Sequence, residues 1–251
     1  MVYEKLGKFE VLKYDKWLSE ILNRDAYCLN FRQDYMEILM DENSKEFIDF
    51  NRYLSESPIF IYCKIPALNI TIIKFLESRG FNLVDTNVTF EKNINKNRYA
   101  LNDKSIRLAN SADCEKVVLL ANGAFHFSRF HLDPLIPKDL ADKIKGEWAN
   151  NYFLGKRGDK MFIKIVNDQI VGFLQLLKDA NNVVIIDLIA VDKNHRRDNI
   201  ACDLIAYAEL EYRHSQVIRT GTQVANIPSI KLYEKLGFRL VDSQYIFHYH
   251  N

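Results

Sequence analysis

The sequence predicts an α+β protein, with a mixed α/β sheet, that is built from two related lobes. The main observation is a repeat: the segment 74–90, KFLESRGFNLVDTNVTF, returns 157 residues later as 231–247, KLYEKLGFRLVDSQYIF, with 8 of 17 positions identical and no gap. Each copy is a short amphipathic run, a Gly-Phe stop and an alternating apolar segment, as expected for a helix, a left-handed cap and a half-buried strand. A unit that occurs twice implies two lobes. The second half adds consecutive strands followed by a helix and another strand, which favours an α+β or mixed α/β lobe.

The two copies differ at one informative position. Tyr233 in the second copy stands where Leu76 stands in the first. Only the second copy therefore offers a hydroxyl group at this place, and we expect the second lobe to carry the chemistry.

The boundary between the lobes is predicted at residues 91–105. This segment, EKNINKNRYALNDKS, is polar, contains four asparagines and shows no apolar period, so it is the best linker in the chain. The predicted domains are 1–95 and 105–251.

The first lobe gives few signals besides its copy of the repeat. Residues 1–58 show mixed, mostly helical periodicity, and no chemistry stands out there. The apolar run Ile59–Ile65 predicts a short strand directly before the first copy.

The second lobe gives clearer signals of secondary structure. Ser111 is the expected N-cap of a helix that carries Val117, Val118 and Ala121 on one side, and a second helix is expected after Pro137. Strands are predicted at 105–110, 160–166, 169–177 and 182–191, with a tight turn at Asn167-Asp168.

Composition excludes several classes of function. A formal net charge of +1 provides no basic excess to neutralise phosphates, so we expect no nucleic-acid partner. The N-terminal stretch is charged throughout, and no apolar run reaches the length of a membrane helix. The four cysteines lie far apart without a CxxC pair, which favours inert thiols in a reducing compartment over a zinc site or a disulfide framework. These features predict a cytoplasmic protein without a membrane partner.

The densest chemical signal is the stretch 187–204, DLIAVDKNHRRDNIACDL. An apolar strand ends at Val191, a loop with Arg196 and Arg197 follows, and a helix begins near Asn199. This order directs unpaired backbone N–H groups and the positive end of a helix dipole at one spot, which is a site for phosphate. Small residues are needed where backbone touches the anion; Ala201 meets that need, and Asn tolerates left-handed geometry almost as Gly does. An ordinary strand-to-helix connection with a solvated arginine pair is the alternative.

This stretch resembles the acyl-CoA-binding segment of the GCN5-related N-acetyltransferases (GNAT), whose usual form is V-x-P-x-x-R-G-x-G-x-G/A-x-x-L. Val191, Arg196, Ala201 and Leu204 fall on the pattern, while Lys193, Arg197 and Asn199 replace its proline and first two glycines.

A second motif strengthens the resemblance. The segment 226–238, NIPSIKLYEKLGF, fills every marked position of the closing motif of the same family, N-x-x-A/S-x-x-x-Y-x-K-x-G-F. The two motifs together imply a full GNAT fold with a splayed central sheet in the second lobe. The first lobe lacks a cofactor loop of its own, which implies a degenerate GNAT-like lobe.

The resemblance implies acetyl-CoA as co-substrate and assigns residues to it. The pantetheine arm would lie along the backbone of Leu188, Ile189, Ala190 and Val191, where one N–H can stabilise the tetrahedral oxyanion. The pyrophosphate would lie against Arg196, Arg197, Asn199, Ile200 and Ala201. Asn226 would contact the pantetheine, although capping of the following helix is enough to explain it.

Two residues are candidates for proton transfer. Tyr233 matches the family tyrosine that protonates the departing CoA thiolate, and a neutral phenol is a good donor to a thiolate. Packing of Tyr233 along its helix is the alternative. Asp187, in apolar surroundings, is the candidate general base, because a carboxyl there must be paired or raised in pKa. A structural hydrogen bond, or a residue that faces water, competes with that role, and deprotonation through a water chain needs no dedicated side chain.

The segment 125–137, FHFSRFHLDPLIP, is similar to the bacterial dTDP-fucosamine acetyltransferase group, whose members acetylate a nucleotide-linked amino-deoxysugar. Arg129 is a candidate for binding the sugar diphosphate and Asp133 for binding a sugar hydroxyl or amine. A core position or a structural ion pair is equally open for Arg129. His248 and His250 share one strand face, and we expect a solvated edge rather than a metal site there.

These observations predict an acetyl-CoA-dependent N-acetyltransferase that acts on the amino group of a nucleotide-linked amino-deoxysugar, by direct transfer in a ternary complex. The alternatives are another small amine, an antibiotic or a peptide N-terminus as acceptor, or a non-catalytic acyl-CoA-binding module. A homodimer stays open.

Overall fold

The computed structural model describes residues 12–30, 40–56, 58–94 and 103–251. These residues form two compact units. The first comprises the described residues up to Asn87 together with 132–136 and 243–251, and the second comprises 88–131 and 137–242. The predicted domain ranges, 1–95 and 105–251, remain a prediction.

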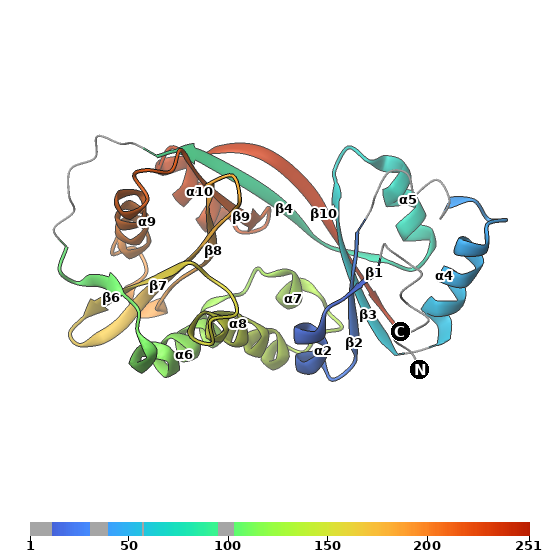
Figure 1. The fold of residues 1–251 in the computed structure, drawn as a ribbon, viewed down its shortest axis with the longest axis horizontal. Helices are drawn as coiled ribbons and strands as arrows, with labels where there is room; N and C mark the ends of the chain where they lie inside the picture. Colours follow the sequence, from blue (N-terminus) through green and yellow to red (C-terminus); the bar gives the residue numbers. More distant parts are fainter. Residues whose placement is uncertain (1–11, 31–39, 57, 95–102) are drawn as a thin grey trace. The chain divides into compact units, whose positions relative to one another are not determined.

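The first unit is a small sheet with helices (Figure 1). Its strand order is β1-β2-β3-β10-β4, with β2 and β3 parallel and β3 and β10 antiparallel. Its elements are β1 (Leu12–Tyr14), α2 (Lys16–Leu22), β2 (Asp25–Leu29), α4 (Lys45–Glu56), β3 (Ile59–Pro66), α5 (Ile70–Ser78), the start of β4 (Asn82–Asn93) and the end of β10 (Arg239–His250).

The expectation of mostly helical structure in residues 1–58 is wrong for two segments, because β1 and β2 are strands. Both are short, with 3 and 5 residues, so they carry little periodicity of their own. They exist through pairing: Tyr27 lies opposite Ile61 of β3 and Tyr14 of β1. The segments 1–11 and 31–39 of the same prediction lie outside the described residues.

The repeat is confirmed in three dimensions. Five residues before each copy, an asparagine side chain caps the helix, Asn69 for α5 and Asn226 for α10 (Ile227–Lys235). In each copy a glycine with positive φ ends the helix, Gly80 at 79° and Gly237 at 84°. A residue with a Cβ is strained in this left-handed region, so the glycine is what permits the turn into the following strand.

The second unit has the strand order β4-β9-β8-β7-β6-β5. Its own elements are β5 (Ile106–Leu108), a 3₁₀ turn at Ser111–Asp113, α6 (Cys114–Ala124), α7 (Arg129–Leu132), α8 (Lys138–Phe153), β6 (Lys160–Val166), β7 (Gln169–Lys178), β8 (Val184–Val191), a 3₁₀ turn at Lys193–His195, α9 (Ile200–Glu211), β9 (Val217–Gln223) and α10.

Two apolar cores cover the two faces of this sheet. Phe162 of β6 packs in one core with residues of α9 and α10, while its neighbours Met161 and Ile163 pack in the other with residues of α6 and α8. This alternation follows from the period of two along a strand. The sheet therefore carries α9 and α10 on one face and α6 and α8 on the other (Figure 1).

The predicted strands and the turn of this unit are confirmed, with Asn167 and Asp168 at φ of 49° and 60° as a two-residue hairpin requires. The N-cap prediction is wrong: Ser111 begins a 3₁₀ turn that the Asn110 side chain caps, and α6 itself begins at Cys114 with Asp113 as its N-cap. The first residues of the predicted linker, 91–93, belong to β4, and its part 95–102 lies outside the described residues.

The sheet of the second unit is split between β8 and β9. Their parallel pairs run only from Val184 opposite Ile218 to Ile186 opposite Thr220, whereas β8 itself continues to Val191. On the other side of β8, the register with β7 shifts at this same point, which leaves Asp187 as a bulge. A bulge bends a strand and increases its local twist. The strands β8 and β9 therefore part just after Ile186.

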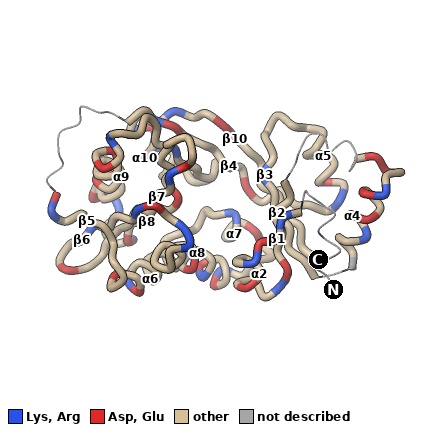
Figure 2. The backbone as a smooth tube through the Cα atoms, viewed as in Figure 1, with Lys and Arg blue, Asp and Glu red and all other residues tan. Residues whose placement is uncertain are grey.

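Basic and acidic residues are interspersed along the described chain (Figure 2). This distribution agrees with the small net charge. Within the described part of the chain, every helix is too short or too polar to cross a membrane.

Candidate active site

A cavity of about 280 Å³ lies where β8 and β9 part. One wall is the end of β8, residues 186–191, and the opposite wall is the end of β9, residues 220–223, with α10. Residues 124–128, which follow α6, line it as well. An adjoining hollow shares Val191, Arg196 and Ala201 with the cavity and extends over the start of α9.

The loop before α9 has the geometry of an anion site. Asn199 is the N-cap of α9 at φ 58°, and its side chain makes no capping hydrogen bond. Two positions earlier, Arg197 lies at φ 77°. The Asn199 side chain thus accepts no hydrogen bond from the first backbone N–H groups of α9, although an N-cap side chain commonly does so. The helix dipole adds positive potential at the same place.

All ten residues predicted to contact a cofactor line this continuous hollow. They are Leu188, Ile189, Ala190, Val191, Arg196, Ala201 and Asn226 in the cavity, and Arg197, Asn199 and Ile200 in its extension. Their roles remain a prediction, but the structure brings them together. The expectation that Asn199 adopts left-handed geometry is confirmed.

Tyr233 lines the cavity from α10, although only 2% of its surface is exposed. Its ring packs 6.0 Å from that of Phe90 and 5.5 Å from that of Phe238. Burial raises the pKa of the phenol above its ordinary value of 10.0, so the proton is retained at neutral pH. Tyr233 is thus both a packed core residue and a protonated phenol at the cavity wall.

Asp187 also lines the cavity, but its carboxylate is occupied. Oδ2 accepts hydrogen bonds from Trp148 Nε1 at 2.9 Å, from Arg157 Nε at 2.7 Å and from Gln175 Nε2 at 3.0 Å. Oδ1 accepts from Arg157 Nη2 at 2.6 Å. Such contacts occupy the lone pairs that a general base would use, which favours a structural role.

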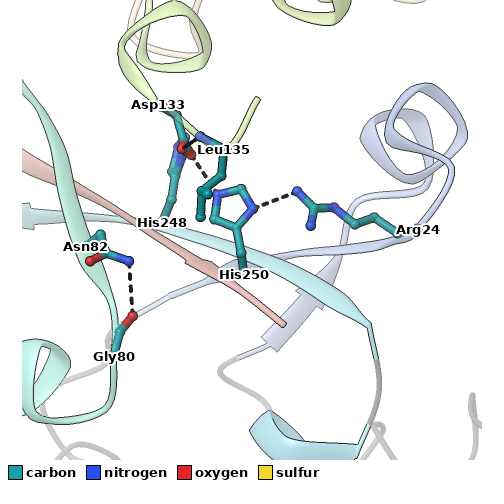
Figure 3. A network of polar contacts seen from close by, with 7 residues as sticks. All are labelled: Arg24, Gly80, Asn82, Asp133, Leu135, His248 and His250. Carbon is teal, nitrogen blue, oxygen red and sulfur yellow. Dashed lines mark hydrogen bonds and ion pairs between the residues drawn. The ribbon is translucent and has the colours of Figure 1, made fainter. Parts of the chain in front are cut away.

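The two predicted acceptor-binding residues are outside the lining of this cavity. Arg129 begins α7, and its guanidinium carbon lies 4.5 Å from the centre of the Phe130 ring. Asp133 belongs to the first unit. There its Oδ2 accepts hydrogen bonds from His248 Nδ1 at 2.6 Å and from His250 Nε2 at 2.7 Å (Figure 3). Both remain predictions as acceptor-binding residues.

The expectation of a solvated edge at His248 and His250 is wrong. The His248 side chain is fully buried and that of His250 is 8% exposed, since Asp133 covers both. The three side chains lie close enough to share a cation. However, Arg24 Nη2 lies 2.7 Å from His250 Nδ1, and a guanidinium can only donate, so Nε2 must carry the proton given to Asp133 (Figure 3). His250 then has no lone pair left for a metal ion.

The sequence-based interpretation missed several polar residues of the cavity, among them Lys145 and Ser128. Lys145 of α8 lines it, with Nζ 5.0 Å from the centre of the Phe125 ring and 4.6 Å from that of Trp148. Ser128 lines it from the turn before α7. Lys145 lacks any motif, but the spacing Ser128-x-x-His131 was a readable signal for a side-chain pair one turn apart.

Comparisons with known proteins show which family this split mixed sheet resembles. Residues 127–238 match the Acetyltransferase (GNAT) family. The chain is similar to the spore coat polysaccharide biosynthesis protein SpsD of Bacillus subtilis, with 33% identity over 54% of this chain and 47% of that protein. It is also similar to N-alpha-acetyltransferase 30 of Homo sapiens, with 30% identity over 41% of this chain and 30% of that protein.

A solved structure gives the same result for the fold. The tandem GNAT protein from the clavulanic acid biosynthesis pathway has a TM-score of 0.57, at 11% identity, over 90% of this chain and 75% of that one. Residues 127–238 therefore resemble a GNAT acetyltransferase domain, and the predicted fold of two GNAT-like lobes is confirmed. The chain spans less than half the length of the two curated relatives.

Proposed function

We propose that this protein is an acetyl-CoA-dependent N-acetyltransferase that transfers the acetyl group directly to an amine in a ternary complex. The observation that carries the proposal is the parting of β8 and β9 beside an anion-binding loop at the start of α9. A thioester whose arm lies in the gap and whose phosphates lie at the loop would present its carbonyl between the two strands.

The main chain of β8 would hold the pantetheine arm. Beyond Ile186 the registered pairs with β9 end, so the polar groups of Leu188–Val191 on that side can pair with an amide-containing chain as with an added strand. An N–H group of this segment can stabilise the oxyanion that forms when the amine attacks. Arg196, whose Nη2 donates to the Ala124 carbonyl at 3.2 Å, and Arg197 would neutralise the pyrophosphate.

Tyr233 would protonate the departing thiolate. It lies on the wall opposite β8, and its raised pKa keeps the proton on the phenol until a strong base such as a thiolate is formed. Asp187 would act as a positioning residue that holds Trp148 and Arg157 at the bulge, rather than as the base, because its oxygens are already engaged.

The acceptor in this proposal is the amino group of a nucleotide-linked amino-deoxysugar. Two observations support this class: the similarity to SpsD, whose name places it in polysaccharide biosynthesis, and the FHFSRFHLDPLIP segment, part of which lines the cavity. A peptide N-terminus is the second candidate, supported by the similarity to an N-alpha-acetyltransferase.

The test measures thiol release from acetyl-CoA with a panel of dTDP- and UDP-linked amino sugars, polyamines, antibiotic amines and peptides. We expect turnover with at least one sugar nucleotide, and initial-rate plots that intersect, as for a ternary complex. Turnover confined to peptides would replace the nucleotide-linked amino sugar by a peptide N-terminus as the acceptor. Tight binding of acetyl-CoA without turnover on any amine would identify a binding module instead.

A further inference from the structure

Three polar side chains form a hydrogen-bonded chain that ends at the cavity. Ser128 Oγ lies 2.6 Å from His131 Nδ1, and His131 Nε2 lies 2.9 Å from Asp142 Oδ1. Ser128 lines the cavity, whereas the His131 side chain is only 4% exposed behind it. Asp142, on α8, is also bound by Lys138.

The chemistry of the donors fixes the direction of this chain. A carboxylate can only accept, so His131 Nε2 carries the hydrogen that is given to Asp142. In the neutral imidazole, Nδ1 then has a lone pair and accepts the hydroxyl hydrogen of Ser128. The serine is thus connected to a base that is itself oriented by a carboxylate, which is the arrangement by which proteins withdraw a proton from a hydroxyl group.

Burial, together with two nearby lysines, keeps His131 neutral at rest. Burial lowers the pKa of His131 below its ordinary value of 6.5; Asp142 opposes this, while Lys145 and Lys138 act in the same direction as burial. Burial would raise the pKa of Asp142, but hydrogen bonds from Lys138 and His131 lower it overall. The pair therefore consists of a neutral imidazole and an ionised carboxylate, ready to accept one proton.

The oxygens of Asp187 are engaged by Trp148, Arg157 and Gln175, so a base other than Asp187 is needed. We propose that Ser128, His131 and Asp142 form the proton relay that deprotonates the acceptor amine, with Ser128 as the catalytic residue that touches the amine and His131 and Asp142 as positioning residues behind it. This inference rests on the proposed acetyl transfer and supplies its missing base.

Each proton in this transfer has a donor and an acceptor. The ammonium group of the acceptor gives one proton to Ser128 Oγ while the proton of Ser128 passes to His131 Nδ1, so the hydroxyl is unchanged and the imidazole becomes an imidazolium facing Asp142. The freed lone pair of the amine forms the C–N bond. As the C–S bond breaks, the sulfur takes the Tyr233 proton, and the second amine proton restores the phenol. His131 then releases its proton to water.

A purely local role makes a different prediction. The backbone N–H of His131 donates to the Ser128 carbonyl at 2.8 Å, so the side-chain pair also closes the first turn of α7. A cap of this kind supports stability, and it leaves the pH dependence of turnover unchanged.

The experiment compares kcat between pH 5 and pH 9 for the wild type, His131→Gln, Ser128→Ala, Asp142→Asn and the control His214→Gln, whose side chain lies on the surface of the same unit. Acceptor and acetyl-CoA are saturating, so that the pKa values of the bound state are reported. We expect the wild-type kcat to fall on the acid side as His131 is protonated. His131→Gln and Ser128→Ala should lower kcat by about 10²-fold or more and remove this acid limb. Asp142→Asn should move the limb to lower pH, and His214→Gln should match the wild type.

Each other result contradicts either the proton relay or the proposed function, and the two cases can be told apart. An active wild type whose acid limb survives in His131→Gln, or a change confined to KM, overturns the relay while the proposed function stands. Should His131→Gln fail to fold, Ser128→Ala decides, since it removes one oxygen atom only. Mass spectrometry that finds an acetyl group on Ser128 after incubation with acetyl-CoA alone would replace the relay by a covalent route. A wild type without activity on any amine overturns the proposed function itself.

Discussion

Leu76 and Tyr233 hold the same position in two helices that end in the same way. The Leu76 carbonyl accepts the N–H of Phe81 at 3.1 Å, and the Tyr233 carbonyl accepts the N–H of Phe238 at 3.0 Å. Both side chains are buried, with exposed fractions of 0% and 2%. The scaffold therefore buries either residue equally well, so the hydroxyl at Tyr233 is not demanded by packing.

This equivalence makes Tyr233→Phe a clean test of the acid role. The variant keeps the ring contacts with Phe90 and Phe238 and loses only the hydroxyl. We expect kcat to fall by about 10²-fold or more, as for loss of a general acid, while the Kd of acetyl-CoA changes less than about threefold. Steady-state kinetics and a calorimetric titration measure the two quantities. Tyr207→Phe on α9, which packs on Phe162 outside the cavity, is the matched control; equal rates for both variants would remove the acid role.

The left-handed residue Asn199 allows the anion loop to be tested without altering any charge. Asn199→Gly should fold and bind acetyl-CoA as the wild type does, since glycine adopts φ 58° freely. Asn199→Val should lose about 1–2 kcal/mol of stability, because a β-branched residue is strained there, and should bind acetyl-CoA at least tenfold more weakly. Thermal unfolding and titration check both. Equal acetyl-CoA affinity in the two variants would show that the loop conformation does not contribute to coenzyme binding.

Gly172 on β7 is a test of how closely α9 packs on the sheet. A Cβ added there would lie 2.8 Å from Ile200 Cγ2 and 3.2 Å from the Ala190 carbonyl oxygen. Gly172→Ala should therefore destabilise the protein by about 1–3 kcal/mol and shift the start of α9, measured by denaturant unfolding. Gly123→Ala, in α6 with open space around the new methyl group, should instead stabilise by about 0.5–1 kcal/mol.

Asp133 should make stability depend on pH. Burial would raise the pKa of Asp133, but hydrogen bonds from His248 and His250 hold it well below its ordinary value of 3.8. A carboxyl group with a depressed folded-state pKa contributes fully above its unfolded-state pKa and loses that contribution as pH falls. Asp133→Asn should thus cost about 3 kcal/mol at pH 7, with the difference from wild type shrinking below about pH 4. Urea unfolding at several pH values measures this, and a difference independent of pH would contradict it.

Asp187→Asn distinguishes positioning from proton abstraction. If Asp187 holds Trp148 and Arg157 in place, the variant should lower stability by about 1 kcal/mol and kcat by about tenfold at every pH, with the acid limb retained. Loss of the limb would restore Asp187 as the base. Stopped assays across the pH range give the answer, and the Arg157 partner is probed in the same way by Arg157→Gln.

Much of the fold could be predicted because its signals are local. The turn at Asn167-Asp168, the glycines that end α5 and α10, and the strand that ends at Val191 all depend on a few neighbouring residues. The short strands β1 and β2 could not be predicted in this way, since β2 pairs with β3 more than 30 residues away and β1 pairs in turn with β2.

The sequence could predict which main-chain segments line the candidate site. It could not predict the side-chain contacts that join residues distant in sequence. The positions along β8 and the start of α9 followed from the motif. The partners of Asp187 did not, because Trp148 and Arg157 are 39 and 30 residues distant in sequence. The pairing of Asp133 with His248 did not follow either, because the two residues are 115 positions apart.

The loop before α9 keeps a left-handed conformation that does not depend on glycine. Arg197 and Asn199 stand where the family pattern has glycine, yet both keep the dihedral angles that glycine makes easy. The left-handed path of the main chain is therefore kept here without glycine, at a small cost in strain. A chain that accepts this strain gains a guanidinium and an amide side chain at the hollow beside the start of α9, without a change in the path of the loop.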